Sequence, residues 1–132
     1  MLFRSSSTFG GNPLSCAAGI AAIQALTQDG LIENAARVGK FFMDGLEKLK
    51  EKHSIVRDVR GKGMMIGVEM KFEVKDILLD GIQEGVLLLY SGRNILRFLP
   101  PLVMSESEVT KVLEVLDRLF TKESERRKNV QG

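Results

Sequence analysis

The sequence contains few of the side chains that several common functional sites require. Its 132 residues include one cysteine, one histidine, one tyrosine and no tryptophan. A single cysteine excludes a disulfide within the chain, and a lone histidine argues against a zinc site or a Ser-His-Asp triad. A net charge of +2 and one tyrosine provide neither the field nor the stacking surface typical of nucleic-acid binding. We therefore expect no metal site and no nucleic-acid partner.

Long apolar runs are also missing. The longest, from Pro13 to Leu26, is too short and too rich in alanine to span a bilayer. The first residues lack the charged and then apolar order of a secretory signal. With 44% apolar and 27% charged residues, the composition is that of a globular domain. We expect a cytoplasmic protein without a membrane partner.

Three sequence features that could indicate a functional site are better explained by ordinary structural roles. Cys16 lies in an alanine-rich apolar run, which predicts a buried and inert thiol. His53 follows the polar end of an amphipathic segment, which predicts a solvated side chain. The stretch from Gly61 to Gly67 has Ile66 where a dinucleotide-binding loop needs glycine or alanine, and it leads into a strand. It is better interpreted as a hairpin turn at Gly61-Lys62-Gly63.

The apolar periodicity predicts an α+β fold. Helices are expected from Pro13, from Leu31 to Lys52, from Val74 to Glu84 and from Ser105, where Glu108 completes a capping box. Strands are expected at 55–60, 64–70, 86–90 and 95–99. This order predicts a small, mainly antiparallel sheet with helices on one face. Residues 121–132 are expected to form a charged, frayed tail.

The opening stretch SSSTFGGNPL, Ser5 to Leu14, has the residues of an anion site. Ser7 and Thr8 offer hydroxyls, the glycine pair permits a close backbone approach, and Asn12-Pro13 predicts a helix N-terminus. The alternative is an ordinary helix cap, because capping needs the same residue types.

Arg97 is the second candidate for a site. In the strand NILRFLPP it shares a face with Ile95 and Leu99, so its guanidinium lies among apolar neighbours. A half-buried guanidinium needs a carboxylate partner or a ligand. An internal ion pair, an edge-strand arginine reaching solvent and a ligand-binding role all remain open.

Three separated segments carry a family resemblance. STFGGNPLSCAAGIAAI (7–23), VRGKGMMIGVEM (59–70) and GVLLLYSGRNILRFLPPL (85–102) closely resemble the C-terminal third of class III pyridoxal-phosphate aminotransferases. The similarity is strongest to the acetylornithine and ornithine aminotransferase branch, and it extends from Ser7 to about Phe120.

The resemblance implies a fold-type I transaminase that forms a homodimer. Residues 1–30 would be the last part of the large cofactor-binding domain, and 31–120 would be the C-terminal small domain. The threonine matching Thr8 would bind the cofactor phosphate of the opposite subunit, and Ser7 would lie beside the substrate. Arg97 would receive the substrate's α-carboxylate. Gly10, Gly11 and Asn12 would shape the loop.

The family's Schiff-base lysine has no counterpart here. The first lysine is Lys40, on the polar face of a predicted helix. The resemblance therefore implies a C-terminal aminotransferase segment, inactive alone, that needs a companion large-domain chain to move an amino group from an ornithine-like or acetylornithine-like amine to 2-oxoglutarate. The alternative is a non-catalytic domain derived from such an enzyme, which self-associates through its apolar Pro13–Leu26 helix.

Overall fold

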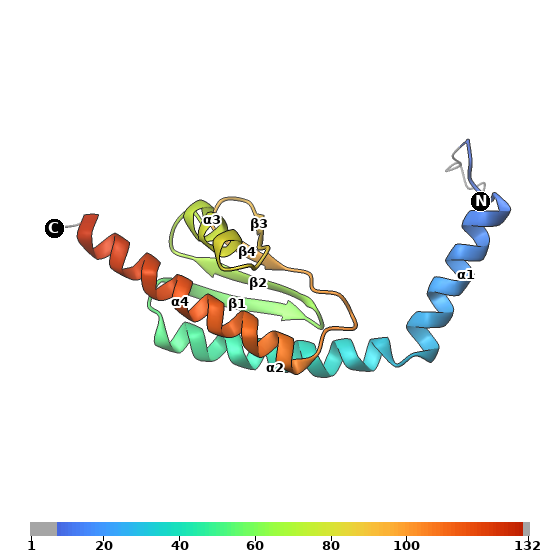
Figure 1. Ribbon diagram of the computed structural model, residues 1–132, viewed down its shortest axis with the longest axis horizontal. Helices are drawn as coiled ribbons and strands as arrows, with labels where there is room; N and C mark the ends of the chain where they lie inside the picture. The colour runs from blue at the N-terminus through green and yellow to red at the C-terminus, as the bar shows by residue number, and fades with distance from the viewer. Residues whose placement is uncertain (1–7, 131–132) are drawn as a thin grey trace, which may run out of the picture. The chain divides into compact units, whose positions relative to one another are not determined.

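The computed structural model of the chain describes residues 8–130, and Ser7 lies outside this range. The chain divides into two compact units, Met1–Ile32 and Glu33–Gly132. The elements in order are α1, α2, β1, β2, α3, β3, β4 and α4 (Figure 1). Among the described residues no helix is long and apolar enough to cross a membrane.

The first unit is built on α1 (Pro13–Gln28), which begins at Pro13 as the sequence predicts. The Ser15 amide donates to Asn12 Oδ1 at 2.9 Å, and Pro13 occupies the first turn. Gly30, just beyond the end, has a positive φ of 67°. No residue of α1 is buried, so the prediction of a buried Cys16 thiol is wrong. A single apolar helix has no second layer that could cover the thiol.

The second unit is organised around α2 (Leu31–Lys52), whose bounds match the prediction. Its buried residues recur every three or four positions and form one stripe: Val38, Gly39, Phe42, Leu46 and Leu49. The Phe42 ring meets the Phe98 ring edge to face, with centroids 5.2 Å apart. This contact packs the stripe of α2 against the sheet.

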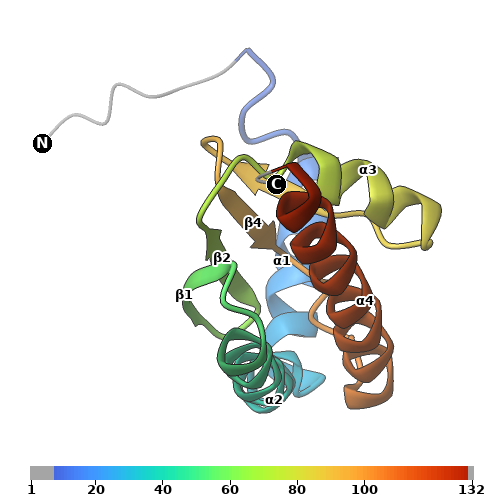
Figure 2. The same cartoon turned by 90° about the vertical axis from the view of Figure 1, so that its left-hand side faces the viewer.

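The sheet has four strands: β1 (Val56–Lys62), β2 (Met65–Met70), β3 (Leu89–Ser91) and β4 (Ile95–Phe98). Their order is β1-β2-β4-β3, and every neighbouring pair is antiparallel. α2 and α4 (Glu106–Val130) lie along one face of this sheet (Figures 1 and 2). The α+β fold with helices on one face is therefore confirmed.

Two local predictions in the sheet are shifted. Lys62 pairs with Met65, so the hairpin turn is Gly63-Met64, with Gly63 at a φ of 56°. Gly61 lies inside β1 instead of in the turn. The strand predicted at 86–90 forms only at Leu89–Ser91, because pairing with β4 is confined to these residues.

The C-terminal helix is longer than predicted. The capping box forms: the Ser105 amide donates to Glu108 Oε2 at 2.8 Å, and the Glu108 amide donates to Ser105 Oγ at 3.3 Å. However, α4 continues to Val130, so residues 121–130 are helical and not a frayed tail. Lys122 and Arg126 pair with Asp80 of α3 (Lys75–Gln83), at 2.8 and 2.9 Å. These contacts hold the charged end of the helix.

His53 is buried, so the prediction of a solvated histidine is wrong. Its side chain is 7% exposed, its Nε2 lies 2.6 Å from Asp117 Oδ1, and its ring packs edge-on against Phe120. Lys52 also pairs with Asp117, at 2.6 Å. Lys52, and then His53, lower the pKa of the Asp117 carboxyl. The cluster joins the C-terminal end of α2 to the middle of α4.

Candidate functional site

The two faces of the sheet carry different side chains, and Arg97 lies on the face that the helices leave open. Along β4, Leu96 and Phe98 are buried while Ile95 and Arg97 are half-buried. The alternation predicted for this strand is confirmed. Because side chains alternate across a strand, Arg97 points to the opposite side from the core.

The Arg97 guanidinium lacks a protein partner within residues 8–130. Its Nε is buried and makes no hydrogen bond, and no carboxylate of the described chain lies within ion-pair distance. The internal ion pair that the sequence left open therefore does not form among these residues. A buried N–H without a partner costs about 1–3 kcal/mol, so the strand holds a donor that an external acceptor could satisfy.

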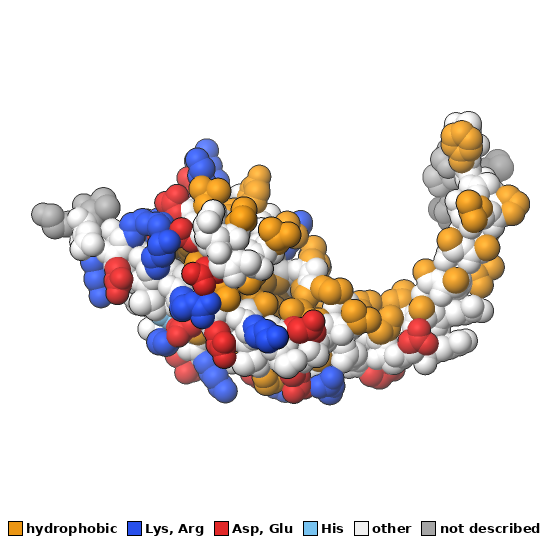
Figure 3. All heavy atoms as spheres, viewed as in Figure 1, with side chains coloured by type: hydrophobic (Ala, Val, Ile, Leu, Met, Phe, Trp, Pro, Cys, Tyr) orange, Lys and Arg blue, Asp and Glu red, His pale blue; other side chains and the backbone are white. Residues whose placement is uncertain are grey.

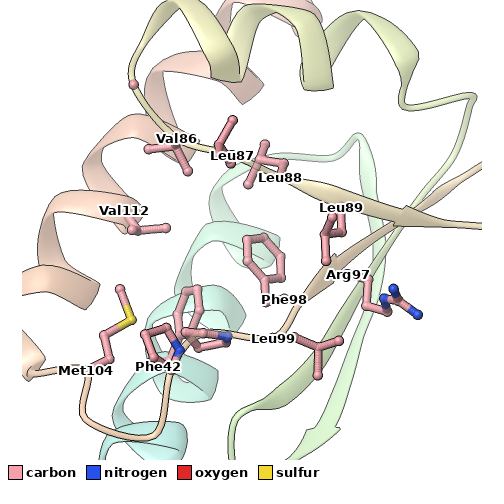
Figure 4. A pocket seen from close by; sticks show the side chains of 13 residues that line it. Phe42, Val86, Leu87, Leu88, Leu89, Arg97, Phe98, Leu99, Met104 and Val112 are labelled. Carbon is pink, nitrogen blue, oxygen red and sulfur yellow. The ribbon is translucent and has the colours of Figure 1, made fainter.

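Two cavities meet at Arg97. One, of about 320 Å³, is mostly apolar and is lined by Phe42, the segment 85–89, Pro100, Pro101, Met104 and Val112 together with Arg97. In Figure 4 the Arg97 guanidinium extends away from the apolar side chains that surround this cavity. The other, of about 400 Å³, lies on the open face and is lined by Arg60, Lys62, Gly67, Ser91 and Arg97 among others.

Gly67 leaves space beside Arg97 in the open-face cavity. The two residues are directly paired across β2 and β4. A Cβ added at Gly67 would meet Ile95 Cγ2 at 3.4 Å and nothing closer. Partners in an antiparallel pair place their side chains on the same face, so any side chain at position 67 would extend alongside Arg97.

The open face carries two half-buried carboxylates, Asp58 and Glu69, and both are already paired with cations. Asp58 lies 3.1 Å from Arg60. Glu69 accepts from Arg60 at 2.9 Å and from Arg57 at 3.0 Å. Arg60, and then Arg57, lower the pKa of the Glu69 carboxyl. A bulge in β1 makes Arg57 an extra residue, which lets both arginines reach the same carboxylate. No carboxylate of residues 8–130 lines the cavity beside Arg97, so the cavity suits an anionic group.

The loop before α1 belongs to the first unit and is described from Thr8 onward. Thr8 is exposed in a turn, and Gly11 has a φ of 78° that favours glycine. Asn12 fixes the loop, since its Nδ2 donates to the Phe9 carbonyl at 2.7 Å. Asn12 Oδ1 also accepts a hydrogen bond from the Ser15 amide. Helix capping therefore accounts for this amide, and no ligand is needed to satisfy it. The predicted role of Ser7 lies outside the described residues.

The candidate residues thus belong to different units: Thr8 to the first and Arg97 to the second. Lys40 is exposed on α2 and pairs with Asp44 at 2.7 Å. The described part of the chain holds no group of three or more histidine, cysteine or acidic side chains placed to bind a metal ion. The residue that sequence reasoning missed is Gly67, which was considered only as part of a phosphate loop. Its cross-strand pairing with Arg97 is the signal that identifies Gly67, and this pairing is known only once the register of β2 and β4 is known.

Comparison with known sequences places the chain in a family. The family model described as aminotransferase class-III matches residues 3–120. The acetylornithine aminotransferase of Caldanaerobacter subterraneus subsp. tengcongensis is 44% identical over 117 residues, which cover 88% of this chain and 30% of that protein. The acetylornithine aminotransferase of Methanocaldococcus jannaschii is 37% identical over 114 residues, which cover 86% of this chain and 29% of that protein.

Solved structures agree with these sequence matches. The acetylornithine aminotransferase of Elizabethkingia anophelis superposes with a TM-score of 0.85 at 30% identity, covering 92% of this chain and 32% of that one. An ornithine aminotransferase of Toxoplasma gondii superposes with a TM-score of 0.86 at 30% identity, and the match covers 97% of this chain and 31% of that one. The chain spans about 30% of the length of the curated relatives it matches. It belongs to the class III aminotransferase family.

Proposed function

We propose that this chain is the C-terminal segment of a pyridoxal-phosphate-dependent aminotransferase. The complete enzyme would move an amino group between an ornithine-like or acetylornithine-like amine and a 2-oxo acid such as 2-oxoglutarate. The cofactor, when bound, would supply the electron sink and carry the amino group between the two substrates. Membership of the class III family supports the reaction type, and the names of the relatives support the substrate class.

The observation that carries this proposal is the unpartnered Arg97 Nε on the open face. A planar guanidinium matches a carboxylate through two parallel hydrogen bonds. The cavity beside it has no carboxylate in its lining and has room at Gly67. Arg97 would hold the α-carboxylate that the amino-acid and 2-oxo-acid substrates share, and so orient each in turn.

The loop before α1 would contribute to a second part of the same pocket. The exposed Thr8 hydroxyl would donate to the cofactor phosphate of another subunit, and Ser7 would lie beside the substrate. The exposure of Thr8 and the turn that Asn12 fixes are compatible with a phosphate contact. Each chain would then supply half-sites, which favours a homodimer or a companion chain.

The chain alone should not catalyse the reaction. Its first lysine, Lys40, is exposed and paired with Asp44, so a lysine that forms the covalent link to the cofactor would come from a large domain. Recovery of activity when such a large domain is added to the chain is the direct test.

Fragment complementation tests the proposal. A relative's acetylornithine aminotransferase, truncated before the third that matches this chain, is mixed with the 132-residue chain and cofactor. We expect a complex that transfers the amino group of N-acetylornithine to 2-oxoglutarate. Arg97→Gln should lower kcat/KM roughly a hundredfold, because a desolvated charge-assisted contact is lost.

Arg57→Gln is the matched control, because Arg57 lies in the same sheet but is paired with Glu69. It should leave kcat/KM within about twofold of the unsubstituted chain. Failure to form any complex would contradict the companion-chain proposal. Activity that does not respond to Arg97→Gln would contradict the role of Arg97.

A second candidate function is self-association without catalysis. Its support is α1, which has no buried residue, although large apolar side chains lie along it (Figure 3): Leu14, Ile20, Ile23 and Leu26. An exposed apolar surface of this kind favours association. Sedimentation velocity over a range of concentrations should show a dimer that Ile20→Glu converts to a monomer. A monomer at every concentration would exclude this function.

A further inference from the structure

A basic cavity of about 420 Å³ lies where the end of α4 meets the segments flanking β1 and β2. Three cations line it, namely Lys71, Arg127 and Lys128, together with Ser54, Ser124 and the Phe72 ring. Among the described residues that line it, none is a carboxylate. None of its residues lines the cavities beside Arg97, so a ligand bound here would be independent of the proposed function.

Arg127 is held in a fixed orientation that leaves its outer edge available. Its guanidinium carbon lies 3.4 Å from the centroid of the Phe72 ring, and its Nε donates to Glu123 Oε1 at 2.7 Å. Stacking fixes the plane of the group, and the Nε contact fixes its rotation in that plane. Within residues 8–130 the two Nη groups make no hydrogen bond or ion pair. They form a preorganised fork of the kind that binds an oxyanion in two places.

The carboxylate beneath this fork is not among the lining residues of the cavity. Glu123 is 1% exposed, and its second oxygen already accepts from Arg126 at 2.6 Å. Arg126 also pairs with Asp80 at 2.9 Å. Glu123 therefore offsets mainly the charge of Arg127, and the unbalanced charge of the cavity comes from its two lysines. The burial of Glu123 makes it an anchor for Arg127 and keeps it from the cavity surface.

The two lysines add charge that no described residue balances. Lys71 and Lys128 form no ion pair within residues 8–130. Cations in the last turn of a helix offset its dipole, and this accounts for Arg127 and Lys128. Lys71 lies outside any helix, and its backbone amide donates to the Ile55 carbonyl at 3.1 Å. Lys71 therefore adds positive charge to the cavity from outside the helix.

We propose that this cavity binds a small anionic molecule through a compact oxyanion, a phosphate or a carboxylate group. The Arg127 fork would bind two of its oxygens, with Lys71 and Lys128 as flanking charges. The Ser54 hydroxyl is a further donor, whereas Ser124 already donates to the Phe120 carbonyl at 2.7 Å. The Phe72 ring supplies an apolar wall for the rest of the molecule. The cavity volume is within the range of small-molecule sites.

The test is a titration of the isotopically labelled 132-residue chain, followed by backbone amide NMR shifts. Inorganic phosphate is the first probe and succinate the second, each against sodium chloride at the same ionic strength. We expect saturable shifts confined to the amides of residues 54–55, 71–72 and 124–128. Tighter binding of phosphate assigns a phosphoryl ligand, and tighter binding of succinate assigns a carboxylate ligand.

Variants separate a built site from general surface charge. Lys71→Gln and Lys128→Gln change exposed side chains and should each weaken binding roughly tenfold. Arg127→Lys keeps the charge but removes the guanidinium fork, and it should weaken binding at least as much as the two lysine substitutions. Lys48→Gln, an exposed lysine on α2 without an ion pair in the described range, is the control and should leave the affinity unchanged. Shifts that match those in chloride, or that persist unchanged in the two lysine variants, would overturn the proposal.

Discussion

The two faces of the four-stranded sheet are made by the same strands but have opposite roles. One face carries Val59, Ile66, Val68, Leu96 and Phe98 into the core. α2 and α4 cover this face (Figure 2). The other carries Arg57, Arg60, Glu69 and Arg97, with a cavity beside them. The core face contributes stability through burial of apolar surface. The open face keeps an unpartnered donor that costs stability, as binding sites commonly do.

The largest effect is expected on the core face of β4. Leu96 is fully buried, so Leu96→Ala should lower the free energy of unfolding by about 2–5 kcal/mol. Urea denaturation followed by circular dichroism measures the change. Ile95→Ala, at the half-buried neighbour on the other face, is the matched control and should cost much less. Equal losses of unfolding free energy at the two positions would contradict the assignment of one face of β4 to the core and the other to solvent.

A pair of glycines tests the same distinction at the backbone. A Cβ at Gly61 would lie 2.4 Å from the Met65 carbonyl oxygen, and Gly61 pairs with the buried Ile66. Gly61→Ala should therefore destabilise the fold by about 1–3 kcal/mol. Gly67→Ala on the open face should change it by about 0.5 kcal/mol or less, since its Cβ makes ordinary contacts. The shift of the urea midpoint of each variant measures its loss of stability. A larger loss of stability for Gly67→Ala than for Gly61→Ala would contradict the pairing register of β1, β2 and β4.

Replacement of Arg97 should stabilise the chain. Arg97→Met keeps an apolar stem and removes the buried Nε–H that lacks a partner, so we expect a gain on the order of 1 kcal/mol. Arg57→Met is the contrasting variant, because it removes a partner of Glu69 and should not stabilise. Thermal unfolding of both variants provides the comparison. A destabilised Arg97→Met would show that the arginine has a structural role.

The smallest effect concerns pH and Glu69. Arg60 and Arg57 lower the pKa of its carboxyl in the folded state, so the ionised form stabilises the fold above the unfolded pKa of about 4.3. This contribution is lost as pH falls through the lowered folded pKa. Glu69→Gln should therefore be less stable than the unsubstituted chain at pH 7, with the difference vanishing in acid. Glu125→Gln, at an exposed carboxylate without an ion pair in the described range, is the control and should leave stability at pH 7 almost unchanged.

Local patterns predicted those parts of the fold that depend on neighbours in sequence. The bounds of α2 follow from its apolar stripe. Asn12-Pro13 and Ser105 with Glu108 identified two helix starts, because a cap acts within four residues. The family resemblance was likewise readable from motifs in order, and the family match confirms it. The roles of Ser7, Thr8 and Arg97 stay predictions.

Only the tertiary structure decided what depends on residues far apart in the chain. His53 is buried because Asp117, 64 positions away, lies against it. α4 extends past Phe120 because Asp80 of α3 pairs with Lys122 and Arg126. Gly67 became part of the Arg97 site only through the register of β2 and β4. Sequence periodicity reports which face of an element is apolar, whereas partners across the fold are fixed when distant segments pack and exclude water.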